Sequence, residues 1–251
     1  MKRHVLISTT HNFKISLTNL EYVCECLKVN FEKVYLTVSN TSDSSITNFI
    51  KHKTSFNYKV IPPRGAGDAR REALSLALFE EDAEAIYLYC DFDKVAVAML
   101  ERRKDFEDFV RNIPPHLHYL IVGRNKESFS TFPDTWQNTE KISNSAASIV
   151  FNIADLDITS GCCAFDYRTG KKILQSSKQR LTDTEWPIIC KACDIPIEFK
   201  SVPFLIYIQK FNHGRNDDNW KGYIPRLTLA LEAIKSLENE IDVTSSRTLK
   251  N

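Results

Sequence analysis

Short apolar runs alternate with helical patterns through the first half of the chain, and this alternation constrains the fold more than any other feature. The runs are rich in Val, Ile, Leu and Tyr without strict apolar-polar alternation, which is typical of strands that helices cover on both faces. Such an order predicts a largely parallel sheet with right-handed crossovers. We expect strands at residues 4–9, 33–39, 57–62, 85–90 and 118–123, and helices at 18–29, 44–52, 67–81 and 95–112.

The second half of the chain has a less regular pattern. It contains neither an internal repeat nor a low-complexity linker, so we predict a single α/β domain. Helices are expected at 137–153, 169–177, 182–194 and 220–239, a loop leading into a short strand at 157–170, and one or two strands at 195–209. The predicted domain covers residues 1–240, with one half at 1–124, a second half at 125–240, and a frayed tail at 241–251.

Composition and charge limit the possible partners and compartment. The formal net charge of +1 gives no global attraction to nucleic acid, so no nucleic-acid partner is expected. No stretch approaches the roughly 18 apolar residues that a transmembrane helix needs, and the start "MKRHVLISTT" predicts a first strand rather than a signal peptide. Seven cysteines, an odd number, favour free thiols over a disulfide framework. We therefore expect a cytoplasmic protein, either free or peripheral to a membrane.

Four of the cysteines could instead bind structural zinc. Cys190 and Cys193 have a C-x-x-C spacing, and Cys162 and Cys163 could complete a set of four thiolates. The first pair lies one helical turn apart in an apolar pattern, however, and the second pair would point in opposite directions in an extended segment. Buried free thiols are the favoured interpretation.

Two carboxylates directly follow an apolar strand in "YLYCDFDKV". Side chains two apart in an extended segment point the same way, so Asp91 and Asp93 are expected to face the cleft beyond the strand while Phe92 turns toward the core. Two like charges repel unless a cation neutralises both, and a hard divalent ion is the simplest such cation. In the alternative interpretation Asp93 caps a helix that begins near Val95 and Asp91 is a turn residue. The position after a buried strand favours the metal.

A glycine-containing turn, "RGAGDARREALSLAL", follows the third predicted strand. Gly65 and Gly67 permit a tight turn, and Asp68 can accept hydrogen bonds from amides at the start of a helix. Arg70 and Arg71 would lie in the first helical turn, where the macrodipole disfavours cations, which indicates that at least one of them binds an anion. A plain turn with surface arginines is the alternative.

Two further segments carry candidate polar residues. In "TDTEWPII", Pro187 is tolerated only in a first helical turn, so a helix is expected to begin near Thr184, and Asp183 or Glu185 could act as a general base. Capping of the helix explains Asp183 equally well. In "FNHGRNDDNW", His213 could bind a metal and Arg215 a phosphate, although each is also common as an ordinary loop residue.

Taken in order, these segments resemble the glycosyltransferases of the GT-A fold, and family-2-type enzymes in particular. The resemblance spans roughly residues 4 to 210. It is carried by the order and spacing of "GAGDARREALSLAL", an apolar strand ending in "DFD", then "DITSGCCAFDYRTGKKIL" and "TDTEWPIICKACDIPIEFKSVPF". The resemblance implies a single GT-A domain with a mostly parallel central sheet.

The resemblance also implies roles for individual residues. Asp91 and Asp93 would hold Mg²⁺ or Mn²⁺ on the diphosphate of a nucleotide-diphosphate sugar, with His213 and Arg215 on a loop that closes over metal and phosphates. The resemblance implies contacts to the nucleotide by Thr9, Thr10, Asp68 and Arg70, and contacts to the acceptor by Ser160 and Gly161. It also implies that Glu185 or Asp183 is the catalytic carboxylate.

The function expected from these features is metal-dependent transfer of a sugar from a nucleotide-diphosphate sugar to an acceptor hydroxyl or phosphate. The acceptor could be a sugar, a lipid phosphate or a small molecule. Nucleotidylyl transfer is an alternative, although "STTHNFKISL" lacks the glycine-rich signature that usually follows the first strand of such enzymes. A further alternative is a non-catalytic nucleotide-binding protein of the same fold.

Overall fold

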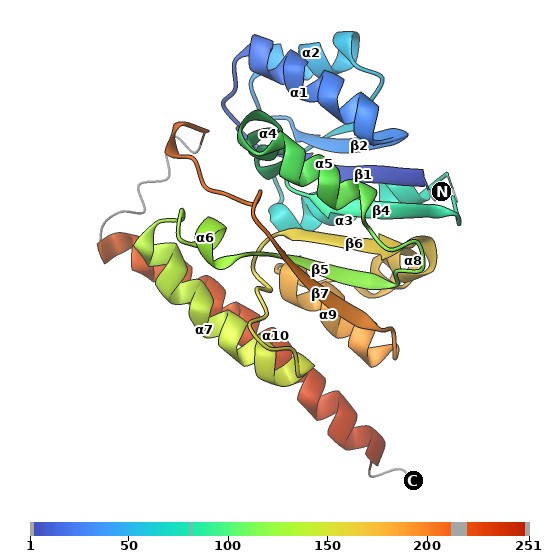
Figure 1. Ribbon diagram of the computed structural model, residues 1–251. Coiled ribbons are helices and arrows are strands. Elements are labelled where there is room, and N and C mark those ends of the chain that lie inside the picture. The colour runs from blue at the N-terminus through green and yellow to red at the C-terminus, as the bar shows by residue number, and fades with distance from the viewer. Residues whose placement is uncertain (1–2, 81, 212–219, 249–251) are drawn as a thin grey trace.

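A seven-stranded sheet forms the centre of the computed structural model, which describes residues 3–80, 82–211 and 220–248, with side chains up to residue 238. The strand order is β3-β2-β1-β4-β6-β5-β7, and every pairing is parallel except the two made by β6 (Figure 1). The predicted mostly parallel α/β sheet is therefore confirmed. The strands are β1 (Arg3–Thr10), β2 (Lys33–Ser39), β3 (Asn57–Ile61), β4 (Ala85–Cys90), β5 (Tyr119–Arg124), β6 (Cys162–Asp166) and β7 (Ile197–Val202).

Helices cover both faces of this sheet and give the molecule three layers (Figure 1). One face carries α1 (Leu17–Asn30), α2 (Ser44–Lys53), α4 (Phe92–Glu101) and α5 (Arg103–Arg111). The other face carries α3 (Ala66–Leu78), α8 (Tyr167–Ser176) and α9 (Thr182–Ala192). The long helices α7 (Asp134–Phe151) and α10 (Tyr223–Thr248) pack against each other and extend the helical layer formed by α3, α8 and α9. The short helix α6 (Lys126–Phe129) follows β5.

Strand β4 shows why the apolar runs do not alternate with polar residues. All six of its residues are buried because the strand lies in the interior of the sheet. Ile86 and Leu88 pack into the core beneath α1 and α4, whereas Tyr87 and Tyr89 pack into the core beneath α3 and α9. A strand in this position removes apolar surface from water on both faces, at roughly 25 cal/mol per Å².

Several helices begin at residues whose side chains accept a backbone hydrogen bond. Ser16 accepts from the Asn19 amide in α1, Asp43 from the Ser45 amide in α2, and Asp166 from the Thr169 amide in α8. Each bond satisfies one of the amides that a helix start leaves without an intrahelical partner. The start of α3 differs, because Gly65 precedes it at φ 104° and provides no side-chain cap.

Three of the differences between the observed and the expected helices have a clear structural description. The predicted helix at 95–112 begins earlier and is divided at Arg102, whose non-helical backbone angles (φ −141°, ψ 36°) separate α4 from α5. Helix α9 begins at Thr182 rather than near Thr184, so Pro187 lies inside the helix and deprives the Asp183 carbonyl of its usual amide partner. Helix α10 continues to Thr248, into the segment for which the sequence predicts a frayed tail.

A buried ion network fixes the loop between α7 and β6. Arg124, at the end of β5, donates from Nε to Asp157 Oδ2 at 2.7 Å and from Nη2 to Glu140 Oε2 at 2.7 Å. Both Arg124 and Asp157 are almost fully buried, and such a pair is costly to break because it would leave an uncompensated charge. Ser160, three residues after Asp157, donates to the Val122 carbonyl at 2.6 Å. The network therefore holds Ser160 and Gly161 beside the end of β4.

The cysteines agree with the interpretation as buried free thiols. All seven lie in the described residues and are free, and all except Cys193 are buried. Cys162 packs into the core on one side of the sheet, whereas Cys163 and Cys190 pack into the core on the other side. Because the sheet separates Cys162 from Cys163 and Cys190, these thiols do not converge on one zinc ion.

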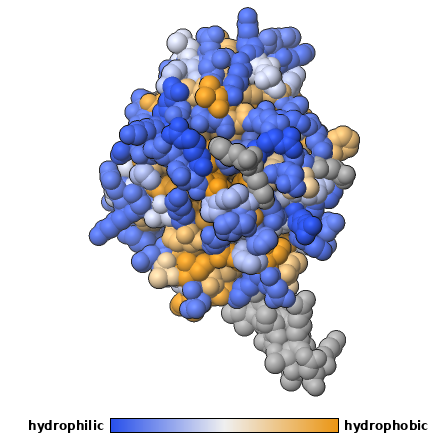
Figure 2. Space-filling view, turned by 45° about the vertical axis from the view of Figure 1, so that its right-hand side comes forward, coloured by the Kyte–Doolittle hydropathy of each residue, from blue (hydrophilic) through white to orange (hydrophobic). Residues whose placement is uncertain are grey.

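The face of the molecule shown in Figure 2 is largely hydrophilic, with apolar side chains gathered toward its lower part. Exposed apolar side chains on α10 include Ile224, Leu227 and Leu231. Within the described residues, no helix combines the length and the apolar character needed to cross a bilayer.

Candidate functional site

A cavity of about 600 Å³ opens beyond the carboxyl ends of four neighbouring strands. Its lining includes Thr9 and Thr10 from β1, Ser39 from β2, Ile61 from β3 and Asp91 directly after β4. Ligands of open parallel sheets bind at this end of the strands, and a cavity of this volume is within the range of small-molecule sites. The predicted nucleotide contacts Thr9 and Thr10 therefore lie in a cavity of suitable size.

The start of α3 forms another wall of this cavity. Gly65, Ala66 and Ala69 line it together with Pro62 and Pro63. Because no side chain caps α3, the first amides of the helix have no cap acceptor. Amides at a helix start attract anions, so this wall suits a phosphate.

Asp91 and Asp93 both line the cavity. Strand β4 ends at Cys90, and α4 begins at once with Phe92, which is fully buried in the core. Asp91 is thus the N-cap residue of α4 and Asp93 lies in its first turn. Both carboxylates thus lie at the cavity, and a helix start rather than an extended segment places them there.

Three side chains hold the carboxylate of Asp91. Tyr89 donates its hydroxyl to Oδ1 at 2.5 Å, Arg70 Nη2 lies 2.9 Å from Oδ2, and Lys94 Nζ also lies 2.9 Å from Oδ2. Burial alone would raise the pKa of Asp91, but the charges of Arg70 and Lys94 outweigh it and hold that pKa well below its usual range. Asp91 is therefore ionised and already neutralised by two cations of the chain.

Arg70 joins this carboxylate to α9. Its Nη1 donates to Asp183 Oδ1 at 2.6 Å and to Thr182 Oγ1 at 2.9 Å, and its guanidinium lies 5.3 Å from the centre of the Tyr89 ring. Burial disfavours the charged form, yet Asp183 and Asp91 raise the pKa of Arg70, which stays charged. The predicted candidates Arg70, Asp91 and Asp183 are thereby brought together in one ion cluster.

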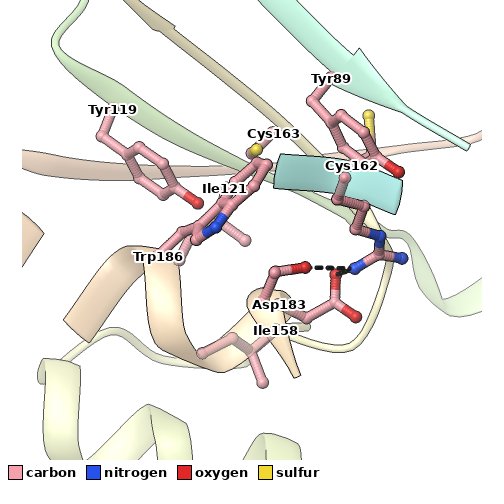
Figure 3. A pocket seen from close by; sticks show the side chains of 10 residues that line it. Tyr89, Tyr119, Ile121, Ile158, Cys162, Cys163, Asp183 and Trp186 are labelled. Carbon is pink, nitrogen blue, oxygen red and sulfur yellow. Dashed lines mark hydrogen bonds and ion pairs between the residues drawn. The ribbon is translucent and has the colours of Figure 1, made fainter. Parts of the chain in front are cut away.

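A second, much smaller cavity of about 10 Å³ lies beside the guanidinium of Arg70. Tyr89, Tyr119 and Trp186 gather around it, with Asp183 at one side (Figure 3). Arg70 Nε is buried and has no hydrogen-bond partner among the described residues. A cavity of this volume has room for about one water molecule, which could satisfy that donor.

Lys94 completes the cluster and connects it to the loop before β6. Its ammonium donates to the Ser160 carbonyl at 2.7 Å as well as to Asp91. Gly161 adopts φ 67°, and a Cβ atom at this position would lie 2.3 Å from Lys94 Nζ. The predicted acceptor residues Ser160 and Gly161 therefore form a cradle around the lysine ammonium, and neither lines the large cavity.

Glu185, predicted as a general base, has a structural role instead. Its carboxylate is buried, accepts from the Ser177 hydroxyl at 2.5 Å and the Gln179 amide at 2.6 Å, and also accepts from the Lys178 amide. It lines neither cavity. These bonds fold the loop before α9, because a buried carboxylate is stable when amides surround it. Of the two carboxylates proposed from sequence, Asp183 alone lies in the ion cluster.

The loop that Glu185 organises packs directly on α3. Arg71 donates to the Gln179 carbonyl at 2.6 Å, and a Cβ atom on Gly67 would lie 2.5 Å from the Arg180 carbonyl oxygen. Gly67 therefore permits close backbone approach rather than a turn. Asp68 lies in the first turn of α3 but is not among the residues that line the cavity. His213 and Arg215 lie outside the described residues.

Two of the residues that hold Asp91, Lys94 and Tyr89, were missed in the sequence, as were cavity-lining residues such as Phe13 and Ser39. Lys94 directly follows the "DFD" segment, and its spacing of three from Asp91 could have indicated a pair at a helix start. Tyr89 could have been found from the two-residue spacing that places it on the same strand face as Tyr87. The bond from Lys94 to Ser160 has no local signal because the two residues are distant in sequence.

The donor set does not fit a divalent cation as it stands. Both oxygens of Asp91 are engaged by the chain's own donors, and among residues 3–80, 82–211 and 220–248 no group of three His, Cys, Asp or Glu side chains could hold a metal ion. Mg²⁺ requires near-octahedral oxygen coordination. A metal on Asp91 would have to displace the ammonium of Lys94.

The ion cluster predicts a specific loss of stability in acid. Because the pKa of Asp91 is lowered by folding, its contribution is complete above the unfolded pKa, at about pH 4, and is lost as pH falls through the lower folded pKa. We expect Asp91→Asn to be less stable than the wild type at pH 7 and to lose less further stability below about pH 4. Urea unfolding across this range measures both effects, with Asp105→Asn, whose side chain is 39% exposed and lies 3.9 Å from Arg102, as the control. Equal acid sensitivity of Asp91→Asn and the wild type would contradict the expectation.

Comparison with known proteins supports the fold. No protein-family model and no curated protein sequence matches the chain. It is similar to glucosyl-3-phosphoglycerate synthase from Mycobacterium tuberculosis in complex with UDP, with a TM-score of 0.57 and 12% identity over 94% of this chain and 80% of that chain. A structure of that synthase with Mn²⁺, UDP-glucose and phosphoglyceric acid gives a TM-score of 0.50 and 12% identity over 91% and 79% of the two chains.

A third similar structure is 4-diphosphocytidyl-2C-methyl-D-erythritol synthase from Anaerococcus prevotii, with a TM-score of 0.46 and 15% identity over 91% of this chain and 96% of that chain. At these identities the likeness concerns the fold. The chain therefore has the fold of the GT-A nucleotide-diphospho-sugar transferases.

Proposed function

We propose that this protein is a glycosyltransferase that binds a nucleotide-diphosphate sugar in the cavity of about 600 Å³ and transfers the sugar to an acceptor hydroxyl or phosphate. The observation that carries the proposal is the position of this cavity, beyond the carboxyl ends of β1 to β4, with Asp91 and Arg70 in its lining. A parallel sheet with a site at this end suits a nucleotide, and the uncapped start of α3 in the lining suits the diphosphate of the donor.

The lining suggests how such a donor would lie. Thr9, Thr10 and Ser39 offer hydroxyl groups for a nucleoside, and Ile61 and Phe13 offer apolar contact. The diphosphate would lie near Gly65 and Ala66, where the amides of α3 begin. The sugar would then point toward the ion cluster and α9.

The proposed reaction needs a leaving group and a base. The bond between the anomeric carbon and the donor phosphate oxygen breaks, and the nucleoside diphosphate leaves with the electron pair. The acceptor oxygen forms the new bond to carbon and gives its proton to a carboxylate. We propose that Asp183 accepts this proton as the general base. Its side chain is 26% exposed, and its Oδ1 lies 2.6 Å from Arg70 Nη1. Arg70 would orient Asp183 while staying charged.

The remaining cofactor and compartment hypotheses stay predictions. A divalent ion on Asp91, Asp93 and His213 would have to compete with Lys94 for Asp91, and His213 lies outside the described residues. The acceptor class and the cytoplasmic location likewise stay predictions. Because the similar synthase structures contain UDP or UDP-glucose, uridine nucleotides are the first ligands to test.

Nucleotide binding is tested by a thermal-shift screen. A ligand that binds only the folded state raises the melting temperature, and ligand at 100 times its dissociation constant adds about 2.7 kcal/mol to the unfolding free energy. We expect at least one of the UDP-, GDP-, CDP-, ADP- and dTDP-sugars to stabilise the wild type. Ala69→Phe, which places a ring in the cavity, should abolish that shift. No shift with any of the five would count against the proposal.

Turnover distinguishes the proposed reaction from its alternatives. Release of nucleoside diphosphate from the bound donor supports glycosyl transfer, release of pyrophosphate from a nucleoside triphosphate supports nucleotidylyl transfer, and binding without products supports a non-catalytic protein. These products are separated by anion-exchange chromatography.

The two carboxylates of α9 should respond differently to substitution. Asp183→Asn is expected to lower kcat by about 10²- to 10⁴-fold, as loss of a general base does, with a smaller change in donor affinity. Glu185→Gln should instead lower the unfolding free energy, because its amide NH₂ group cannot accept the bonds from residues 177–179. Steady-state kinetics and urea unfolding of both variants distinguish a catalytic role of Asp183 from a stabilising role of Glu185. Unchanged kcat in Asp183→Asn would remove it as the base.

A further inference from the structure

Lys94 lies where an oxygen-lined cation site would be expected. Its ammonium is within 2.9 Å of Asp91 Oδ2 and 2.7 Å of the Ser160 carbonyl oxygen. Asp93, which lines the cavity together with Asp91, adds a second negative charge that favours the protonated lysine. A carboxylate pair and a backbone carbonyl are the kind of oxygen set that usually holds a hard metal ion.

The surrounding backbone is shaped for this ammonium. Gly161 adopts φ 67°, and a Cβ atom there would lie 2.3 Å from Lys94 Nζ and 2.7 Å from Asp91 Oδ2. The side chain of Lys94 is 22% exposed, so the pair is not an ordinary surface salt bridge. A glycine at this position therefore leaves room for the charged group.

Lys94 also has an advantage over a dissolved metal ion. It lies three residues after Asp91, and a group tethered so closely has a high effective concentration at its partner. A second cation on Asp91 Oδ2 would be repelled by the ammonium and by Arg70, which lies 2.9 Å from the same oxygen. The chain thus neutralises Asp91 with its own side chains.

We propose that Lys94, together with Arg70, substitutes for the divalent cation in this site, so that the protein binds a diphosphate-containing ligand without metal. This inference rests on the proposed function for the nature of the ligand. An ionised and unpaired Asp91 would repel a diphosphate at the cavity, whereas the pair with Lys94 and Arg70 removes that repulsion.

The first test uses the wild type with UDP and with inorganic pyrophosphate as probes. Calorimetry in EDTA and in Mn²⁺ should give UDP affinities that agree within about threefold, because no metal is needed. The affinity for pyrophosphate is measured only in EDTA, because pyrophosphate itself would bind Mn²⁺ in solution. A loss of UDP affinity of about tenfold or more in EDTA would overturn the inference.

The second test uses Mn²⁺ alone, measured by electron paramagnetic resonance. The wild type should bind no Mn²⁺ at this site, whereas Lys94→Ala removes the ammonium from Asp91 and the Ser160 carbonyl and should bind Mn²⁺ measurably more tightly than the wild type, even with Arg70 still beside Asp91. Adding Asp91→Asn to Lys94→Ala should abolish the new site. Lys94→Met, which keeps the apolar stem, serves if the alanine variant does not fold.

Lys104→Ala, an exposed lysine on neighbouring α5, is the matched control and should behave as the wild type. Wild-type binding of Mn²⁺ that Asp91→Asn removes would overturn the inference. If neither UDP nor pyrophosphate binds in any buffer, the proposed function fails for these probes, while the Mn²⁺ measurement still decides the role of Lys94.

Discussion

The guanidinium of Arg70 is the interaction on which the candidate site depends. It lies 2.9 Å from Asp91 at the end of β4 and 2.6 Å from Asp183 at the start of α9, so one buried cation joins the two halves of the chain. A buried charge is stable only when it is paired, and removing one partner of such a pair costs several kcal/mol. Helix α3 begins at Ala66, so Arg70 lies just beyond its first turn rather than within it as the sequence predicted, and its buried charge is explained by these two carboxylates.

Much of the fold and part of the site could be predicted because the signals are local. Strands covered on both faces read as apolar runs, and β1 to β5 lie where those runs lie. Parallel strands end at the same edge, so the residues after β1 and β4 could be placed at a common cavity from sequence order. The opposite orientations of Cys162 and Cys163 followed from the two-residue period of a strand.

The remaining features depend on contacts between distant segments. The antiparallel insertion of β6 between β4 and β5 has no local sequence signal. Glu185 reads as a candidate base in an early helical turn, but the loop at 177–179 folds back to satisfy it. The sequence around Lys94 predicts an ordinary helix residue, because its contacts with Ser160 and Gly161 form only when the distant loop folds against it. Asp91 is therefore a carboxylate held by cations, although the sequence alone favoured a metal ligand.

The central claim is that the cavity beyond β1 to β4 binds the nucleotide of an activated sugar. Hydrogen exchange of backbone amides, measured with and without UDP or the nucleotide identified by screening, tests this most directly because it reports where the ligand lies. The account predicts slower exchange in two segments that line the cavity, residues 9–13 at the end of β1 and Gly65, Ala66 and Ala69 at the start of α3. Protection confined to other segments, with no change at these two, would contradict it.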